Sequence, residues 1–151
     1  MNNSTLFGIV EVIVISGALA AGCAQMSNMM HGDHKATGED VALNGSNEVP
    51  PVTSSAAATG NVSVSSDCMV TARINVTGMS PTAAHIHMAA PGSNGPVIVP
   101  FVKQGDSTFV SQPGAKMTEE QCRAYKSGNT YVNVHSAAHP GGEIRAQLKG
   151  G

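Results

Sequence analysis

The fold is decided by the segment YVNVHSAAHPGGEIRAQL at residues 131–148. Its first half alternates apolar Val132 and Val134 with polar neighbours up to His135, and a period of two is typical of a β-strand with one apolar face. After the turn residues SAAHPGG the alternation continues in EIRAQL, where Ile144 begins a second apolar face. Glycine and proline favour a tight reversal of the chain at this turn. The segment therefore predicts an antiparallel β-hairpin.

A second segment, AAHIHMAAPGSNGPV at residues 83–97, has the same pattern. His85 and His87 alternate with Ala84 and Ile86, so the two imidazoles are expected on one face of a strand. Such a polar face either holds a ligand such as a metal ion or faces water. The histidines expected on these faces, or just beyond them, are His85, His87, His135 and His139.

Further β-like runs cover most of the chain after residue 40. They are separated by turn residues, as in a β-sandwich or barrel. The expected strands lie at residues 41–49, 61–66, 69–77, 83–89, 96–102, 107–111, 130–135 and 143–149. One short helix, TEEQCRAYKS at about 118–127, precedes the last hairpin, because Thr118 and Gln121 fit a capping box. The sequence thus predicts an all-β fold with one short helix.

The composition excludes several functional classes. The chain has 151 residues, a net charge of −2, no tryptophan, two tyrosines and three phenylalanines, so the core of a single domain must be largely aliphatic. No basic run interleaved with aromatic residues is present, which excludes nucleic acid as an expected partner. The sequence also lacks the GxSxG, HExxH, P-loop and dinucleotide-binding motifs of common enzymes.

Residues 1–23 are expected to form an export signal. The apolar stretch at 6–21 is short and carries Glu11, which favours a signal peptide over a membrane span. It ends in AAGC, which resembles a bacterial lipobox whose cysteine, here Cys23, receives a lipid. Because no lysine or arginine precedes the stretch, cleaved secretion and a retained anchor are the alternatives. The expected location is the cell envelope, lipid-anchored to a membrane and facing the periplasm or the exterior, or else secreted.

Residues 24–40 are polar and lack periodicity, so we expect a flexible tether to a domain at 41–149. The tether combines thioether and imidazole groups, a soft ligand set that suits copper, Cu(I) especially. It is either an accessory copper-capturing arm or a tether without a metal role. The candidate ligands are Met26, Met29, Met30, His31 and His34.

Two cysteines remain once Cys23 is assigned to a lipid. Cys68 and Cys122 are then an even number of cysteines, and an exported protein lies in a compartment that permits disulfides. We therefore expect the two to be bonded to each other. Two buried free thiols, or a thiolate metal site, are the alternatives. The thiolate site has no support from a CxxC motif.

The histidine-bearing strands offer a site for copper or zinc. Residues i and i+2 on a strand lie about 6.6 Å apart on one face, so His85 and His87 can converge on one ion through metal–nitrogen bonds of about 2 Å. A third imidazole comes from His135 if its strand lies beside the first. The candidates that would complete or orient this ligand set are His139, Glu143 and Asn133. In the alternative interpretation these histidines are ordinary outward-facing residues of an exported domain.

Five motifs follow one another in the chain: ALNGSNEVPPV at 42–52, TGMSP at 77–81, GSNGPVIVPF at 92–101, a helix ahead of GNTYVNVHS at 128–136, and PGGEIRAQL at 140–148. Together they resemble the CHRD domain, a family named from chordin and also found in bacterial exported proteins. The resemblance spans about Val41 to Leu148 and implies an immunoglobulin-like β-sandwich or barrel, without a settled activity. It also singles out Glu48 as a residue that would bind the metal or orient its ligands, for which a solvated carboxylate at a strand end is the alternative. Arg145 is expected at the surface or in a salt bridge.

The stretch VTGMSPTAAHIH at 76–87 is also similar to the strand and turn that carry the HxH copper ligands of copper,zinc superoxide dismutases. Three functional hypotheses follow. The favoured one is an envelope lipoprotein that binds a transition metal, copper before zinc, through surface histidines. The second is a structural or adhesive module that binds a protein or polysaccharide. The third is a dismutase-like enzyme, which is less expected because no fourth strand histidine is evident.

Overall fold

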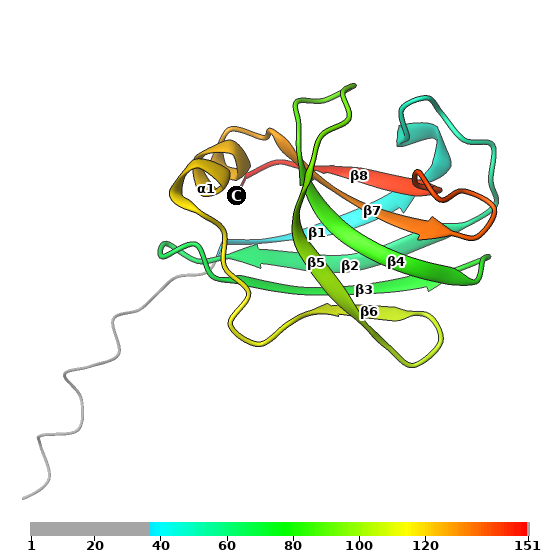
Figure 1. Cartoon of the computed structure of the whole chain (residues 1–151), viewed down its shortest axis with the longest axis horizontal. Helices are drawn as coiled ribbons and strands as arrows, with labels where there is room; N and C mark the ends of the chain where they lie inside the picture. The colour runs from blue at the N-terminus through cyan, green and yellow to red at the C-terminus, as the bar shows by residue number, and fades with distance from the viewer. Residues whose placement is uncertain (1–36, 151) are drawn as a thin grey trace, which may run out of the picture. The chain divides into compact units, whose positions relative to one another are not determined.

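The computed structural model describes residues 37–150, which form an all-β domain with one short α-helix (Figure 1). The predicted fold class is therefore confirmed. The strands are β1 (Thr37–Asn44), β2 (Ala57–Val64), β3 (Val70–Thr77), β4 (Pro81–Met88), β5 (Val97–Gln104), β6 (Thr108–Ser111), β7 (Thr130–Ser136) and β8 (Ile144–Leu148). The helices are α1 (Glu119–Lys126) and the 3-10 turn η1 (Gly45–Asn47).

The strands close into an antiparallel barrel in the order β1-β2-β3-β6-β5-β4-β7-β8. Five of the strand pairs join strands that are consecutive in the chain, and the pairs β3·β6, β4·β7 and β1·β8 join strands that are not. The second of these pairs places the two histidine-bearing segments side by side, as Figure 1 shows for β4 and β7. The spacing of the predicted strands was compatible with a sandwich or a barrel, and the structure is a closed barrel.

The interior of the barrel is aliphatic, as the composition predicted. In β3 the burial alternates strictly, with Val70, Ala72, Ile74 and Val76 inside and polar residues outside. Fully burying a side chain of the size of Ile74 stabilises the fold by about 1.5–3 kcal/mol. Phe109 of β6 is a buried aromatic member of this cluster, and the partly buried Phe101 of β5 packs against it.

Strand β7 departs from the alternation because all seven of its residues are buried. Its outward side chains are covered by two loops that come from distant parts of the chain. Asn94, in the loop between β4 and β5, donates from its side chain to the carbonyl of Val49 at 2.7 Å, and Asn47 donates to the carbonyl of Arg145 at 3.1 Å. The histidine-bearing face of the sheet is therefore largely enclosed, whereas the sequence pattern predicted a face open to water.

Helix α1 forms where the sequence predicted it. The Thr118 hydroxyl accepts from the backbone N–H of Gln121, whose side chain accepts from the backbone N–H of Thr118. The helix brings Cys122 to Cys68, and the two form the expected disulfide with a Cα–Cα distance of 5.7 Å. The thiolate metal site and the two free thiols are thereby excluded.

Strand β1 begins at Thr37, four residues before the expected domain boundary at Val41, because residues 37–40 pair with β2. It ends at Asn44 and does not continue to Val49, since the Asn44 side chain accepts from the N–H of Asn47 and caps the turn η1. The signal segment, Cys23 and the Met/His arm lie outside the described residues.

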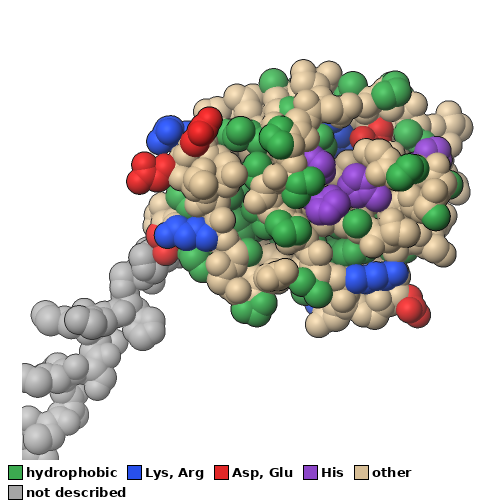
Figure 2. All heavy atoms as spheres, in the orientation of Figure 1, with side chains coloured by type: hydrophobic (Ala, Val, Ile, Leu, Met, Phe, Trp, Pro, Cys, Tyr) green, Lys and Arg blue, Asp and Glu red, His purple; other side chains and the backbone are tan. Residues whose placement is uncertain are grey.

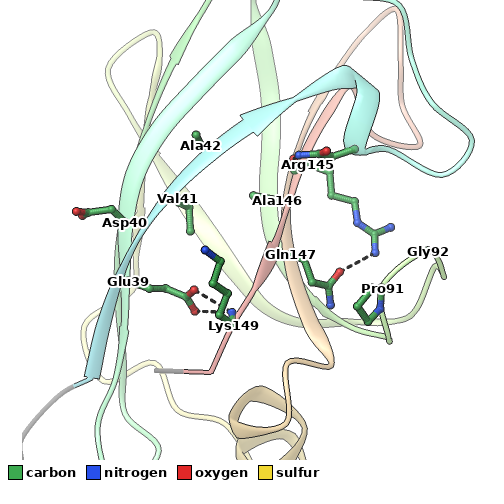
Figure 3. Close-up of a pocket in the computed structure, with 11 residues that line it drawn as sticks. Glu39, Asp40, Val41, Ala42, Pro91, Gly92, Arg145, Ala146, Gln147 and Lys149 are labelled. Atoms are coloured by element: carbon green, nitrogen blue, oxygen red, sulfur yellow. Dashed lines mark hydrogen bonds between the residues drawn. The ribbon is translucent and has the colours of Figure 1, made fainter.

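The barrel closes between β1 and β8 through a single residue pair, Asn44 with Arg145. No further residues of β1 and β8 are paired, and the Glu39 carboxylate accepts from the backbone N–H groups of Lys149 and Gly150 (Figure 3). A groove of about 530 Å³ lies along this seam, and Pro91 and Gly92 of the β4–β5 loop form part of its wall. No helix within residues 37–150 is long and apolar enough to cross a membrane.

Replacing both Cys68 and Cys122 by alanine is expected to lower the free energy of unfolding by about 4 kcal/mol, because the cross-link restricts the unfolded chain over 54 positions. Urea denaturation measures this loss. Reduced wild-type protein is the matched control, since it keeps both side chains. A double variant as stable as the oxidised wild type would contradict the prediction.

Candidate metal centre

Three imidazoles meet on the outer face of the barrel, two from β4 and one from β7. His85 pairs with Asn133 across the two strands, and His135 pairs with Ala83, so His85 and His135 are diagonal neighbours on the same face. One ligand nitrogen from each of His85, His87 and His135 lies within 4.8 Å of the other two. The Nδ1 atom of His85 is 3.0 Å from Nε2 of His135. The convergence on which the metal hypothesis depended is therefore present, and Figure 2 shows histidine side chains gathered on this face.

Two of the rings are oriented by backbone carbonyls. Nδ1 of His87 lies 2.9 Å from the carbonyl oxygen of Gly95, and Nδ1 of His135 lies 3.0 Å from that of Pro140. A carbonyl oxygen only accepts, so in both rings Nδ1 carries the proton, and the neutral form of each ring presents its lone pair at Nε2. Metal-ligating histidines are typically held in this way by a carbonyl or carboxylate on the other ring nitrogen.

Glycine is required at position 95 for this orientation. A Cβ atom built there would collide with the backbone carbonyl of Met88. The absence of a side chain lets the β4–β5 loop return closely against the end of β4, where the Gly95 carbonyl meets His87.

The electrostatics of the cluster favour neutral imidazoles. Burial, and then the neighbouring His135 and His87, lower the pKa of His85 to about 4. Burial also lowers the pKa of His135, which the Pro140 carbonyl partly opposes and His87 reinforces. Neutral rings are the form that binds metal, so the fold prepares His85 and His135 as ligands at neutral pH.

The site also fits a metal because it leaves a buried nitrogen without a partner. Nε2 of His87 is buried and has no hydrogen-bond partner among the described residues. An unpaired buried polar atom costs free energy, and a bound ion would remove that cost. The 3.0 Å distance between Nδ1 of His85 and Nε2 of His135 is compatible with an ion shared by these two rings at bond lengths of about 2.0–2.1 Å.

The histidines are less exposed than the sequence indicated. His87 and His135 are each 8% exposed, and His85 is half-buried, so the expectation of surface histidines holds only for His85. The covering loops cause the difference. They leave the cluster near the surface but largely shielded from water.

The other hairpin candidates are not brought into the cluster. His139 lies in the turn, where its backbone N–H donates to the Ser136 hydroxyl and its carbonyl accepts from Gly142. Glu143 lies just beyond the turn, where its backbone N–H donates to the carbonyl of Val134 at 2.8 Å, but its carboxylate accepts from Ser54 at 2.6 Å. Burial raises the pKa of Glu143, and hydrogen bonds from Ser136 and Ser54 outweigh that effect and lower it. Neither residue belongs to the group of converging ligands.

Asn133 and Glu48 form the layer beside the cluster. Glu48 is 5% exposed, so the alternative of a solvated carboxylate at a strand end is wrong. Burial raises its pKa, while the charge of Arg145 and a hydrogen bond from Asn133 lower it. Oε1 of Glu48 and Oδ1 of Asn133 are both buried without a hydrogen-bond partner in the described part of the chain.

The sequence pattern missed an aromatic and a cationic residue next to the site. Tyr131 stacks on His87 with ring centroids 4.8 Å apart and an interplanar angle of 7°. Arg145 places its Cζ atom 3.4 Å from the Tyr131 centroid. Arg145 is 1% exposed, so its expected surface position is wrong. The alternation in β7 and β8 already put both residues on the histidine face, but nothing in the sequence indicated that loops would cover that face.

Comparison with protein families places this barrel in a known group. The family model for the CHRD domain matches residues 40–148, so the chain belongs to the CHRD-domain family. Neither a curated protein nor a solved structure was found to be similar.

Acid is expected to destabilise the metal-free domain partly through His85. Its pKa is about 4 in the folded state and 6.5 in an unfolded chain. Between these values the unfolded chain binds a proton that the folded chain does not, so the free energy of unfolding decreases as the pH falls through this window. The free energy of unfolding, measured by urea denaturation across this pH window, should depend less on pH for His85→Asn than for the wild type. His139→Asn, which removes an imidazole outside the cluster, is the control, and equal slopes for wild type and His85→Asn would contradict the lowered pKa.

Proposed function

We propose that this CHRD-domain protein binds a transition-metal ion, copper in preference to zinc, through His85, His87 and His135. The observation that carries the proposal is the convergence of three imidazole nitrogens within 4.8 Å. It is supported by the carbonyls that fix the tautomers of His87 and His135. Imidazole is a good ligand for both copper and zinc.

The number of ligands favours a site that exchanges its ion. Three protein ligands leave one coordination position for water or a partner's ligand, whereas structural zinc sites use four. His85 is the most exposed of the three ligands, so the open position is on its side of the cluster. This arrangement suits a protein that captures an ion and passes it on.

Export to the cell envelope is part of the same proposal. Cys23 would anchor the mature chain to a membrane, with the domain facing the periplasm or the exterior. The Cys68–Cys122 disulfide supports an oxidising compartment of this kind. The preference for copper draws on the Met/His arm, whose thioethers are soft ligands.

Removing the three imidazoles should abolish metal-induced stabilisation. A ligand at one hundred times its dissociation constant stabilises the folded state by about 2.7 kcal/mol, which a thermal shift assay with copper and with zinc detects. We expect this shift for the wild type and for His139→Ala, and none for the variant combining His85→Ala, His87→Ala and His135→Ala. Equal shifts in the triple variant and the wild type would remove the proposed site.

The arm is tested separately in the full chain by replacing its ligands with serine. The positions are Met26, Met29, Met30, His31 and His34. The expected result is one tightly bound copper ion that persists and a loss of additional weak copper binding, measured by equilibrium dialysis. Unchanged stoichiometry would remove the copper-capturing role of the arm.

A second candidate function is the binding of a protein or polysaccharide at the seam groove. Its support is a groove of about 530 Å³ lined by carboxylate, guanidinium and amide groups (Figure 3). Such a partner would bind saturably in the presence of a chelator, and substitutions of the three histidines would leave that binding unchanged. Metal binding by the three histidines, in contrast, would be abolished both by the chelator and by the substitutions.

A further inference from the structure

Arg145 is a buried cation on the outer face of the barrel. Its guanidinium donates to the carbonyl of Ser93 at 2.9 Å and to the side-chain oxygens of Asn94 and Gln147 at 3.1 and 3.2 Å. All three acceptors are neutral. They accept three hydrogen bonds from the guanidinium but do not cancel its positive charge, which arginine keeps at any physiological pH.

Tyr131 connects this charge to the proposed metal ligand His87. Strand β7, which carries Tyr131, lies between β4 and β8 in the barrel. The ring is therefore held between the His87 imidazole on one side and the Arg145 guanidinium on the other, in a stack and a cation–π contact. Arg145 does not contact the ligand nitrogens, so its effect on an ion would be electrostatic.

The proposed ligands supply no negative charge to offset an ion. All three are imidazoles, and the carboxylate of Glu143 is engaged by Ser54. Glu48 is the carboxyl group whose charge acts on Arg145, and the two are coupled through space. A divalent ion at this site would thus be repelled by Arg145 about twice as strongly as a monovalent ion, and buried charges are only weakly screened by salt.

We infer that Arg145, stacked on Tyr131, makes the three-histidine site select Cu(I) over Cu(II). This inference rests on the proposed metal-binding function. For one unit charge separated from the ion by two stacked groups in a partly buried environment, Coulomb's law gives a change on the order of tenfold in the ratio of Cu(I) to Cu(II) affinity. That ratio corresponds to about 60 mV in the reduction potential of bound copper. Arg145 and Tyr131 are positioning residues in this scheme, and the charge of Glu48 acts in the opposite direction.

The test measures the affinity of the full chain for Cu(I) and for Cu(II) by competition with chelators. The Cu(I) measurements are made under anaerobic conditions. Arg145→Met removes the charge, whereas Arg145→Lys keeps it and loses the guanidinium plane. The ratio of Cu(I) to Cu(II) affinity is expected to fall about tenfold in Arg145→Met relative to Arg145→Lys. Glu48→Gln removes a negative charge near Arg145 with almost no change in shape, so it should raise the ratio. Tyr131→Phe keeps the stack and should leave the ratio close to that of the wild type.

The outcomes separate this inference from the function on which it rests. A wild-type chain that binds neither copper ion overturns the proposed function. A wild-type chain that binds copper, with equal affinity ratios in Arg145→Met and Arg145→Lys, overturns the inference alone. If Arg145→Met does not fold, Glu48→Gln decides, and a ratio that stays unchanged or falls overturns the selection for Cu(I).

Discussion

The antiparallel pairing of β4 with β7 is the constraint on which the candidate site depends. These strands are separated by two others in the chain, yet they lie side by side in a register that sets His85 opposite Asn133 and His87 opposite Tyr131. A shift of one residue would turn the His135 imidazole of β7 to the other face of the sheet. The aliphatic residues that alternate with the histidines fix this register, since Ile86, Val132 and Val134 are fully buried. The hydrophobic core thereby determines the geometry of a polar site on its outer side.

The polar layer outside the barrel is the less usual part of the molecule. Arg145 and Asn133 are almost inaccessible to water although they lie on the outward face of β8 and β7, and Glu48, directly after η1, is buried as well. Burial of such groups costs free energy unless they find partners. Here the loop at 89–96 and the segment around Asn47 supply many of those partners. The histidines share this burial, which lowers the pKa values of His85 and His135.

Local patterns in the sequence were sufficient for the elements and for the three imidazoles. The alternation around His85 and His135 predicted two strands with their histidines on matching faces, and the capping box at Thr118 predicted the helix. Burial of the outward face could not be predicted, because it depends on contacts such as that between Asn47 and Arg145, which are 98 residues apart. For the same reason Glu48 was expected in water and Arg145 at the surface. The sequence also could not show that Glu143 is not among the ligands, because its partner Ser54 lies 89 residues away.

The single pair that closes the barrel has a consequence for its dynamics. Each residue of β1 is paired with a residue of β2, whereas only Asn44 of β1 is paired with a residue of β8. Alternate backbone amides of β1 point toward each neighbour, so those that point toward β8 should exchange deuterium with solvent much sooner than those that point toward β2. The seam between β1 and β8 is thus the part of the barrel that can open locally, while its aliphatic interior stays closed elsewhere.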